Sequence, residues 1–181
     1  MAIQMTLSKE LKLQMEHGGT LAIGKRKTKR PVVTKRPMHV VLRTVEGAPN
    51  LIRYQTGIHE ILTRHVNRFS VQTYERAICS NHIHLAVRSK TREGFLNFLR
   101  AICGRIAQLA KKSSQQKFWE SIPYTRIVQW GRHFLRLLKY VRQNTLEADG
   151  RLAYQPRYLQ QKKRSPGPGA FLGRWVSIRG A

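Results

Sequence analysis

Two strand-like runs near the middle of the chain are separated by only two residues, and this spacing constrains the fold more than any other feature. The runs cover residues 71–79 and 82–88, with Ser80 and Asn81 between them. A connection this short joins neighbouring strands that run in opposite directions, because parallel strands need a crossover of a dozen residues or more. The sequence therefore predicts a tight antiparallel hairpin.

The segments on either side of this hairpin indicate the fold class. Hydrophobic periodicity predicts a strand over 38–45, a helix over 51–69, a helix over 92–112, a strand within 118–130 and a helix over 133–144. The order β-α-β-β-α-β-α is that of a ferredoxin-like split βαβ sandwich, an α+β fold. We expect an antiparallel sheet with helices on one face, an extra C-terminal helix, and a second face available for a ligand.

The charge of the chain points to a polyanionic partner. Thirty-four Lys and Arg residues stand against nine Asp and Glu residues, a formal net charge of +25, and such an excess is costly to the compact state unless a polyanion offsets it. Nucleic acid is the expected partner, with a membrane surface or ribosomal RNA as the alternative. We expect a basic arm with a short helix over 1–36, a folded domain over 37–146 and a basic tail containing Pro and Gly over 147–181.

Other residues indicate the cellular compartment and the candidate contacts to DNA phosphates. No apolar run is long enough to cross a membrane, and Cys79 and Cys103 lie in apolar runs, as expected of core thiols in a reduced, cytoplasmic protein. The expected DNA-binding residues lie near the histidines described next and in the basic arm: Arg43, Arg88, Lys90, Arg92, Lys25, Arg26, Lys27, Lys29 and Arg30.

Histidines are spaced so that they share one face of the predicted sheet. In an extended strand, residues two apart point the same way, so His82 and His84 lie together while Ile83 faces the core. Two imidazoles on one face can hold a divalent metal ion. The alternative is a structural or exposed histidine pair. If the strand over 38–45 presents the same face, His39 joins the two, which a structure with His39 and His84 on opposite faces would refute.

Several segments together carry a family resemblance. They are Met38–Arg43, Asn81–Leu85, Phe95–Arg100, Phe118–Glu120 with 126–128, and Tyr140–Asn144. Over residues 37–146 the chain resembles the HUH single-strand nucleases, and more narrowly the IS200-like and REP-associated tyrosine transposases. The resemblance implies that His82 and His84 hold Mg²⁺ or Mn²⁺, with a third ligand that could be His39, Gln108 or Gln115. It implies no small-molecule cofactor, and it leaves a homodimer open.

The same resemblance implies a chemistry on single-stranded or hairpin DNA. A tyrosine would attack the scissile phosphate, giving a 5′-phosphotyrosine and a free 3′-hydroxyl group. An ungapped comparison places the expected tyrosine at Ile106, which cannot be a nucleophile, and Cys103 one turn earlier reads as a core residue.

Three hypotheses follow for the function. The first is a transposase-derived protein that binds hairpin or single-stranded DNA without nicking it. The second is an active transposase or nuclease whose tyrosine is displaced, to Tyr140 or to Tyr124. The neighbours of Tyr140 favour a packing role for that residue. The third is an RNA-binding protein of ferredoxin-like fold in which the histidine pair is incidental.

Overall fold

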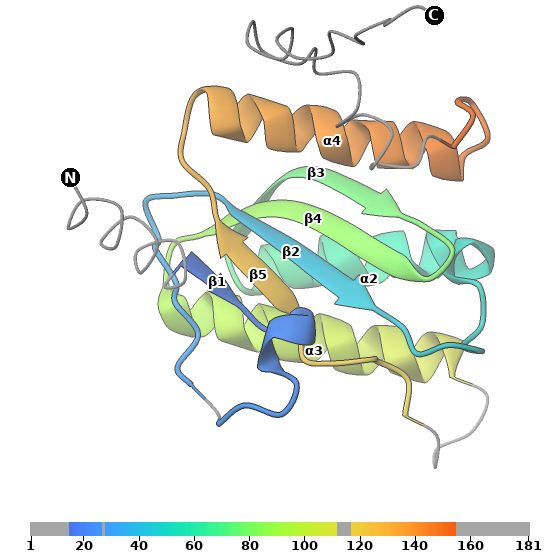
Figure 1. Ribbon diagram of the computed structural model, residues 1–181, viewed down its shortest axis with the longest axis horizontal. Helices are drawn as coiled ribbons and strands as arrows, with labels where there is room; N and C mark the ends of the chain where they lie inside the picture. The colour runs from blue at the N-terminus through green and yellow to red at the C-terminus, as the bar shows by residue number, and fades with distance from the viewer. Residues whose placement is uncertain (1–14, 27, 112–116, 155–181) are drawn as a thin grey trace, which may run out of the picture.

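The computed structural model describes residues 15–26, 28–111 and 117–154, and within them a sheet is flanked by helices (Figure 1). The elements in chain order are β1 (Glu16–His17), the 3₁₀ helix η1 (Gly19–Ala22), β2 (Met38–Arg43), the 3₁₀ helix η2 (Leu51–Tyr54), α2 (Gln55–Arg68), β3 (Val71–Ile78), β4 (His82–Ser89), α3 (Arg92–Ala110), β5 (Tyr124–Ile127) and α4 (Arg132–Ala148). None of the helices in these ranges is long and apolar enough to cross a membrane.

The sheet has the strand order β1-β5-β2-β4-β3, and every neighbouring pair is antiparallel. The order β2-α2-β3-β4-α3-β5 is the predicted split βαβ arrangement, so the predicted fold class is confirmed. The central hairpin also forms as predicted, since the backbone N–H of Cys79 donates to the carbonyl oxygen of His82 across the turn. The β3–β4 register shifts between Thr73 and Glu75.

The larger core lies between the sheet and the helices α2 and α3. Met38, Val40 and Leu42 alternate along β2, and Ile83, Leu85 and Val87 alternate along β4; these six side chains pack against Phe95, Phe98, Ile102 and Ile106 of α3. All are 0–1% exposed. Full burial of an aliphatic or aromatic side chain stabilises a fold by roughly 1.5–3 kcal/mol, so this layer holds the sheet rigidly and fixes which strand positions face the other way.

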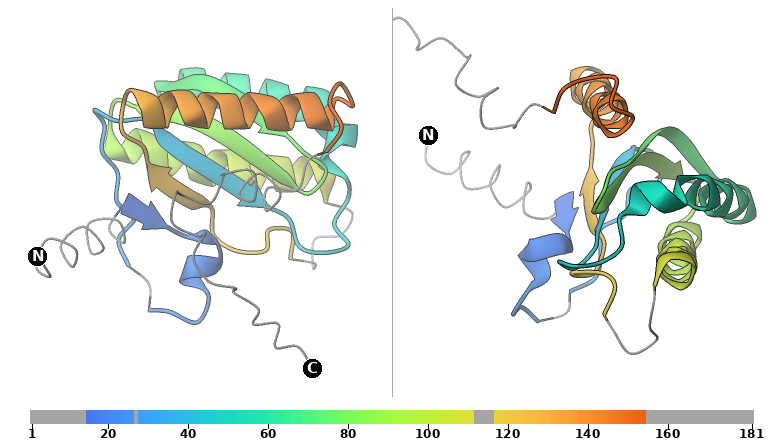
Figure 2. Two further views of the ribbon diagram at one scale, coloured as in Figure 1. Left: turned by 45° about the horizontal axis from the view of Figure 1, so that its top comes forward. Right: turned by 90° about the vertical axis from the view of Figure 1, so that its right-hand side faces the viewer.

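Helix α4 packs on the opposite face, which the sequence had left open for a ligand. Leu137 and Val141 of α4 pack with Ala77, Cys79 and Ala86 of the sheet in a second, smaller core. Small strand side chains let the helix approach closely. Figures 1 and 2 show α4 lying along the β3 and β4 side of the sheet, away from α2 and α3. The second face is therefore partly covered, and the helix becomes one wall of whatever site the face contains.

Part of the predicted N-terminal arm belongs to the sheet. Glu16 pairs with Arg126 and His17 pairs with Thr125, which adds β1 beside β5. The short helix predicted within the arm, over residues 6–16, lies outside the described residues except for Met15 and Glu16, and Glu16 is part of β1. Gly18 follows β1 at φ +82°, and a Cβ atom there would lie 2.1 Å from the carbonyl oxygen of Pro123. Only glycine fits at this position, because its backbone conformation is left-handed and its neighbour is fixed backbone.

Candidate functional site

Three side chains from three different elements meet on the face that α4 covers. His39 of β2 and His84 of β4 lie side by side, with His39 Nε2 3.1 Å from His84 Nδ1. The hydroxyl oxygen of Tyr140 on α4 lies 3.5 Å from His84 Nε2. The strand register places Val41 opposite His84, so both histidines point to the same face. The expectation that the two strands share this face is confirmed.

His82 completes the histidine pair at the start of β4. Its ring lies 4.6 Å from the His84 ring, centroid to centroid, and its Nδ1 atom lies 2.7 Å from Asn81 Oδ1. His84 is 4% exposed, whereas His82 is half-buried. A cavity of about 350 Å³ opens beside His82. Asn144 and Glu147 of α4 line it with His82, together with Ile52, Cys79, Ser80, Asn81, Ala148 and Tyr154.

The environment keeps His39 neutral. Burial, together with the smaller effect of the positive charge of Arg126, lowers the pKa of His39 from 6.5 to about 4. A neutral His39 can still accept or donate one hydrogen bond at each ring nitrogen. His39 therefore contributes an uncharged polar side chain to the site, although the protein as a whole is strongly basic.

Tyr140 is brought to the histidines by the amphipathic pattern of α4. Val141 is fully buried and Leu137 nearly so, and these contacts orient the helix so that Tyr140 points along the sheet face. The side-chain amide of Asn144 donates to the carbonyl oxygen of Tyr140 at 2.7 Å. The apolar neighbours that favoured a packing role for Tyr140 are the same residues that position its hydroxyl group at the site.

Tyr124, the other tyrosine considered, is held differently. It lies on β5, with its ring edge-on to His39 at 6.4 Å between centroids. Burial, the negative charge of Glu16 and a hydrogen bond to the Glu16 carboxylate together raise the pKa of Tyr124 to about 12. A phenol held by a carboxylate is harder to ionise, so Tyr124 is poorly suited to nucleophilic attack.

Position 106 lies on the wrong face of the sheet to be a nucleophile. Ile106 is 0% exposed and packs in the core between the sheet and the helices α2 and α3. No side chain there could reach His82 or His84, because the sheet lies between them. The prediction that Ile106 occupies the place of the tyrosine is therefore wrong, since it assumed that the helix following β4 faces the histidines.

The predicted phosphate-binding residues do not gather in one place. Arg43 pairs with His82 across the β2–β4 ladder, and its Nε lies 3.2 Å from Glu120 Oε2. Arg88 shares the histidine face farther along β4, whereas Lys90 follows the far end of that strand. The other basic residues of the predicted set lie elsewhere. Arg92 donates to the carbonyl oxygen of Arg30, and Arg30 in turn donates to Thr125 Oγ1. Lys25, Arg26 and Lys29 are exposed, and Lys27 lies outside the described residues.

A basic stripe on α4 was missed by the sequence analysis. Arg132, Arg136, Lys139 and Arg142 are all exposed on the outer side of this helix. Their spacing of three and four residues places them in one row, and that spacing was the signal that could have identified them. Tyr140 lies on the same helix, so this basic stripe runs beside the site. The sequence had instead predicted basic DNA contacts on the N-terminal arm.

Of the two glutamines considered as a third metal ligand, the structure places Gln108 away from the histidines. Gln108 accepts a hydrogen bond from Arg105 on the exposed side of α3, across the sheet from the histidines, and Gln115 lies outside the described residues. Among the residues that the structure describes, no three His, Cys, Asp or Glu side chains cluster as metal ligands. From α4, the amide of Asn144 and the carboxylate of Glu147 line the cavity beside His82 as potential metal ligands.

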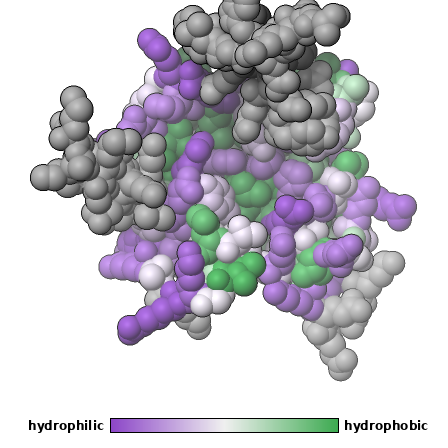
Figure 3. Space-filling model, viewed as in Figure 1, coloured by the Kyte–Doolittle hydropathy of each residue, from purple (hydrophilic) through white to green (hydrophobic). Residues whose placement is uncertain are grey.

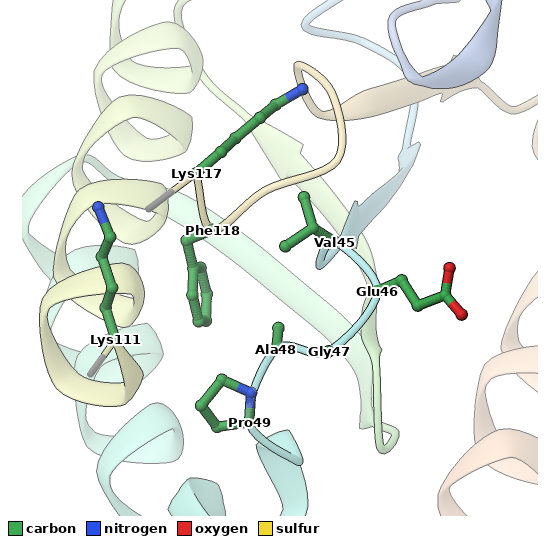
Figure 4. A pocket seen from close by; sticks show the side chains of 8 residues that line it. All are labelled: Val45, Glu46, Gly47, Ala48, Pro49, Lys111, Lys117 and Phe118. Atoms are coloured by element: carbon green, nitrogen blue, oxygen red, sulfur yellow. The ribbon is translucent and has the colours of Figure 1, made fainter. Parts of the chain in front are cut away.

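A second cavity, of about 440 Å³, lies away from these residues (Figure 4). It is formed by the loop 45–49 together with Lys111, Lys117 and Phe118, and the Glu46 side chain points away from it. None of the predicted site residues lines it. Figure 3 shows hydrophilic side chains over most of the side viewed in Figure 1, with hydrophobic ones in small separate groups.

One solved structure shares the architecture of this chain. No family model matches the sequence, and no curated protein matches it. Among solved structures, a REP-associated tyrosine transposase bound to a REP hairpin superposes with a TM-score of 0.58 at 10% identity, covering 85% of this chain and 95% of that chain. A putative transposase from Deinococcus radiodurans R1 gives a TM-score of 0.39 at 13% identity, covering 66% of this chain and 98% of that chain. At 10% identity, the first likeness shows that the two proteins share a fold.

Proposed function

We propose that this protein is a transposase-like enzyme of the IS200 and REP-associated type, which binds single-stranded or hairpin DNA and cleaves it with Tyr140. The observation that carries the proposal is the 3.5 Å approach of the Tyr140 hydroxyl group to His84 beside His82. It favours the second of the three hypotheses, because a tyrosine does reach the histidine pair, from a helix other than the expected one. The shared fold with a hairpin-bound transposase supports the choice of substrate.

Tyr140 has the position and exposure that a nucleophile needs. It is half-buried, and its hydroxyl oxygen lies 3.5 Å from His84 Nε2. Attack of its oxygen on phosphorus would form the phosphotyrosine bond and break the bond to the 3′ oxygen. The phenol proton passes to water, and the departing 3′ oxygen takes a proton from water, so the step balances without a further reactant.

His82, His84 and the Asn144 amide oxygen are the proposed ligands of a divalent cation, Mg²⁺ or Mn²⁺. Their chemistry fits, because imidazole nitrogens and amide oxygens bind such ions, and His82 and Asn144 line one cavity. When bound, the cation supplies charge stabilisation at the scissile phosphate. His39 stays neutral beside His84, which avoids a second positive charge at the proposed metal ligands.

The substrate would run along α4. Arg136, Lys139 and Arg142 are exposed near Tyr140, and Arg43 lies next to His82. A row of exposed cations of this kind can contact the phosphates of a single strand that passes the site. A half-buried tyrosine also cannot reach a phosphate shielded within a duplex without local opening.

The test is formation of a covalent adduct. The protein is incubated with hairpin-flanked single-stranded DNA labelled at its 3′ end and Mn²⁺, and the label is followed on a denaturing protein gel. Attack by Tyr140 leaves the 5′-phosphate fragment on the protein, so the 3′ label should migrate with it. Tyr140→Phe should abolish the adduct, while Tyr124→Phe should retain it.

Other outcomes separate the competing hypotheses. An adduct that survives in Tyr140→Phe would overturn the assignment of the nucleophile. Tight hairpin binding with no adduct in the wild type would support a DNA-binding protein that does not nick. Equal competition by unrelated RNA and by hairpin DNA, unaffected by His82→Ala, would support the RNA-binding hypothesis.

A further inference from the structure

The Nδ1 atoms of both site histidines have protein partners. Asn81 Oδ1 lies 2.7 Å from His82 Nδ1, and His39 Nε2 lies 3.1 Å from His84 Nδ1. In a neutral imidazole one nitrogen carries the proton and the other carries the lone pair, and the partner of one nitrogen decides the role of the other. The two partners therefore control which nitrogen each histidine offers to a ligand.

For His82 the assignment follows from the partner alone. A side-chain amide oxygen can only accept a hydrogen bond, so the Nδ1 atom of His82 must be the donor. The lone pair of neutral His82 is then on Nε2. Asn81 therefore does more than form the turn that the sequence predicted for it.

For His84 the partner is another imidazole, and one of the two nitrogens must donate. His39 is 8% exposed and His84 is 4% exposed, so neither ring can exchange this contact for water at low cost. If His84 Nδ1 donates, its Nε2 carries the lone pair and can accept from the Tyr140 hydroxyl group 3.5 Å away, which suits a phenol because a phenol donates a hydrogen bond more readily than it accepts one. If His39 donates instead, His84 presents an N–H group at Nε2 and cannot bind a cation there.

We propose that Asn81 and His39 are positioning residues that hold His82 and His84 in the Nδ1–H tautomer, so that both offer Nε2 to a divalent cation. The cation rests on the proposed function, whereas the tautomers are a property of the metal-free protein. Outer partners of this kind orient metal-binding histidines in many proteins, and their loss typically costs 10–100-fold in metal affinity.

The tautomers are measured directly in the metal-free, ¹⁵N-histidine-labelled protein. Two-bond ¹H–¹⁵N correlation spectra at pH 8 with EDTA distinguish the protonated nitrogen of each ring. Both His82 and His84 should be in the Nδ1–H form. Finding either one in the Nε2–H form in the wild type would overturn the proposal for that residue.

Variants of Asn81 test the outer contact without disturbing the fold. Asn81 is exposed. Its backbone carbonyl oxygen accepts a hydrogen bond from the backbone N–H of Thr44, and a side-chain substitution leaves this bond in place. Asn81→Ala should shift His82 towards the Nε2–H form and weaken Mn²⁺ binding 10–100-fold. Asn81→Asp should restore both, because a carboxylate accepts the same hydrogen bond. Asn97→Ala on α3, which removes an exposed Asn bonded to Arg100, is the matched control and should change neither.

Variants of His39 test the inner contact. His39→Phe removes the acceptor and keeps a ring, and should release His84 from the Nδ1–H form. His39→Gln keeps an acceptor and should retain it, which a purely structural role of His39 would not predict. If His39→Phe does not fold, His39→Gln and the Asn81 pair still decide the matter.

These outcomes separate the inference from the proposed function. Unchanged tautomers in both Asn81→Ala and His39→Phe would overturn it, and so would the absence of Mn²⁺ binding by the wild type. By contrast, loss of the proposed cleavage activity, with no Tyr140 adduct formed, leaves the tautomers and the Mn²⁺ affinities to stand on their own measurements.

Discussion

Acid should destabilise this fold through His39, and the size of the effect follows from its burial. The pKa of His39 is about 4 in the folded protein against 6.5 for an unburied histidine. A group whose pKa is lower when folded binds protons preferentially in the unfolded state, so stability falls as the pH decreases from about 6.5 towards 4. A difference of about 2.5 pKa units corresponds to at most about 3 kcal/mol, of which about 2 kcal/mol is lost by pH 5.

The assay is urea unfolding followed by circular dichroism at pH 7.5 and pH 5, at fixed ionic strength and with EDTA. The free energy of unfolding of the wild type should fall by about 2 kcal/mol more than that of His39→Leu over this interval. His59, whose pKa burial also lowers, contributes in the same direction in both proteins and cancels in the comparison. Replacing the exposed His133 controls for the loss of a histidine. An identical pH dependence in wild type and His39→Leu would refute the reasoning, because it would mean that His39 is not held neutral.

Three further predictions test the fold and the basic surface. Gly18→Ala should lower the thermal unfolding midpoint measured by calorimetry, because a Cβ atom would lie 2.1 Å from the Pro123 carbonyl oxygen and the backbone is left-handed; an unchanged midpoint would mean that β1 does not dock there. Ile106→Ala should cost about 2–5 kcal/mol in urea unfolding, and a loss below about 1 kcal/mol would place this residue outside the core. Arg136→Gln and Lys139→Gln should each reduce the slope of log K against log salt for hairpin DNA by about one in a titration by fluorescence anisotropy; unchanged slopes would exclude the α4 stripe from the DNA contact.

Local pattern was enough to predict the fold of this chain. Alternation along 38–45 and 82–88, the two-residue turn between the central strands, and helical spacing over 92–112 each specify an element that the structure contains, as β2, β4 and α3. Such patterns work because one face of each element must be buried, which sets the side-chain period regardless of the partner. The same alternation placed His82 and His84 on one face, and the strand register adds His39 to them.

Only the tertiary structure decided which helix covers the face that carries the histidines. The helix after β4 is amphipathic, and nothing in its spacing tells which side of the sheet it covers, so the sequence assigned the tyrosine position to Ile106 on the wrong side. The helix that faces the histidines comes at the end of the domain, and it packs there because the strand side chains beneath it, Ala77 and Ala86, are small. Long-range packing of this kind cannot be read from residues that are neighbours in sequence.

The sequence thus determined the sheet, its two faces and the histidine pair, because each depends on a period of two or 3.6 residues along the chain. The tertiary structure decided which tyrosine meets those histidines, and it supplied Asn144, Glu147 and the basic stripe from the same helix. Each of these depends on where α4 packs against the sheet. Tyr140, for example, comes 56 residues after His84 in the sequence. That placement is fixed by packing across the sheet rather than by any local signal.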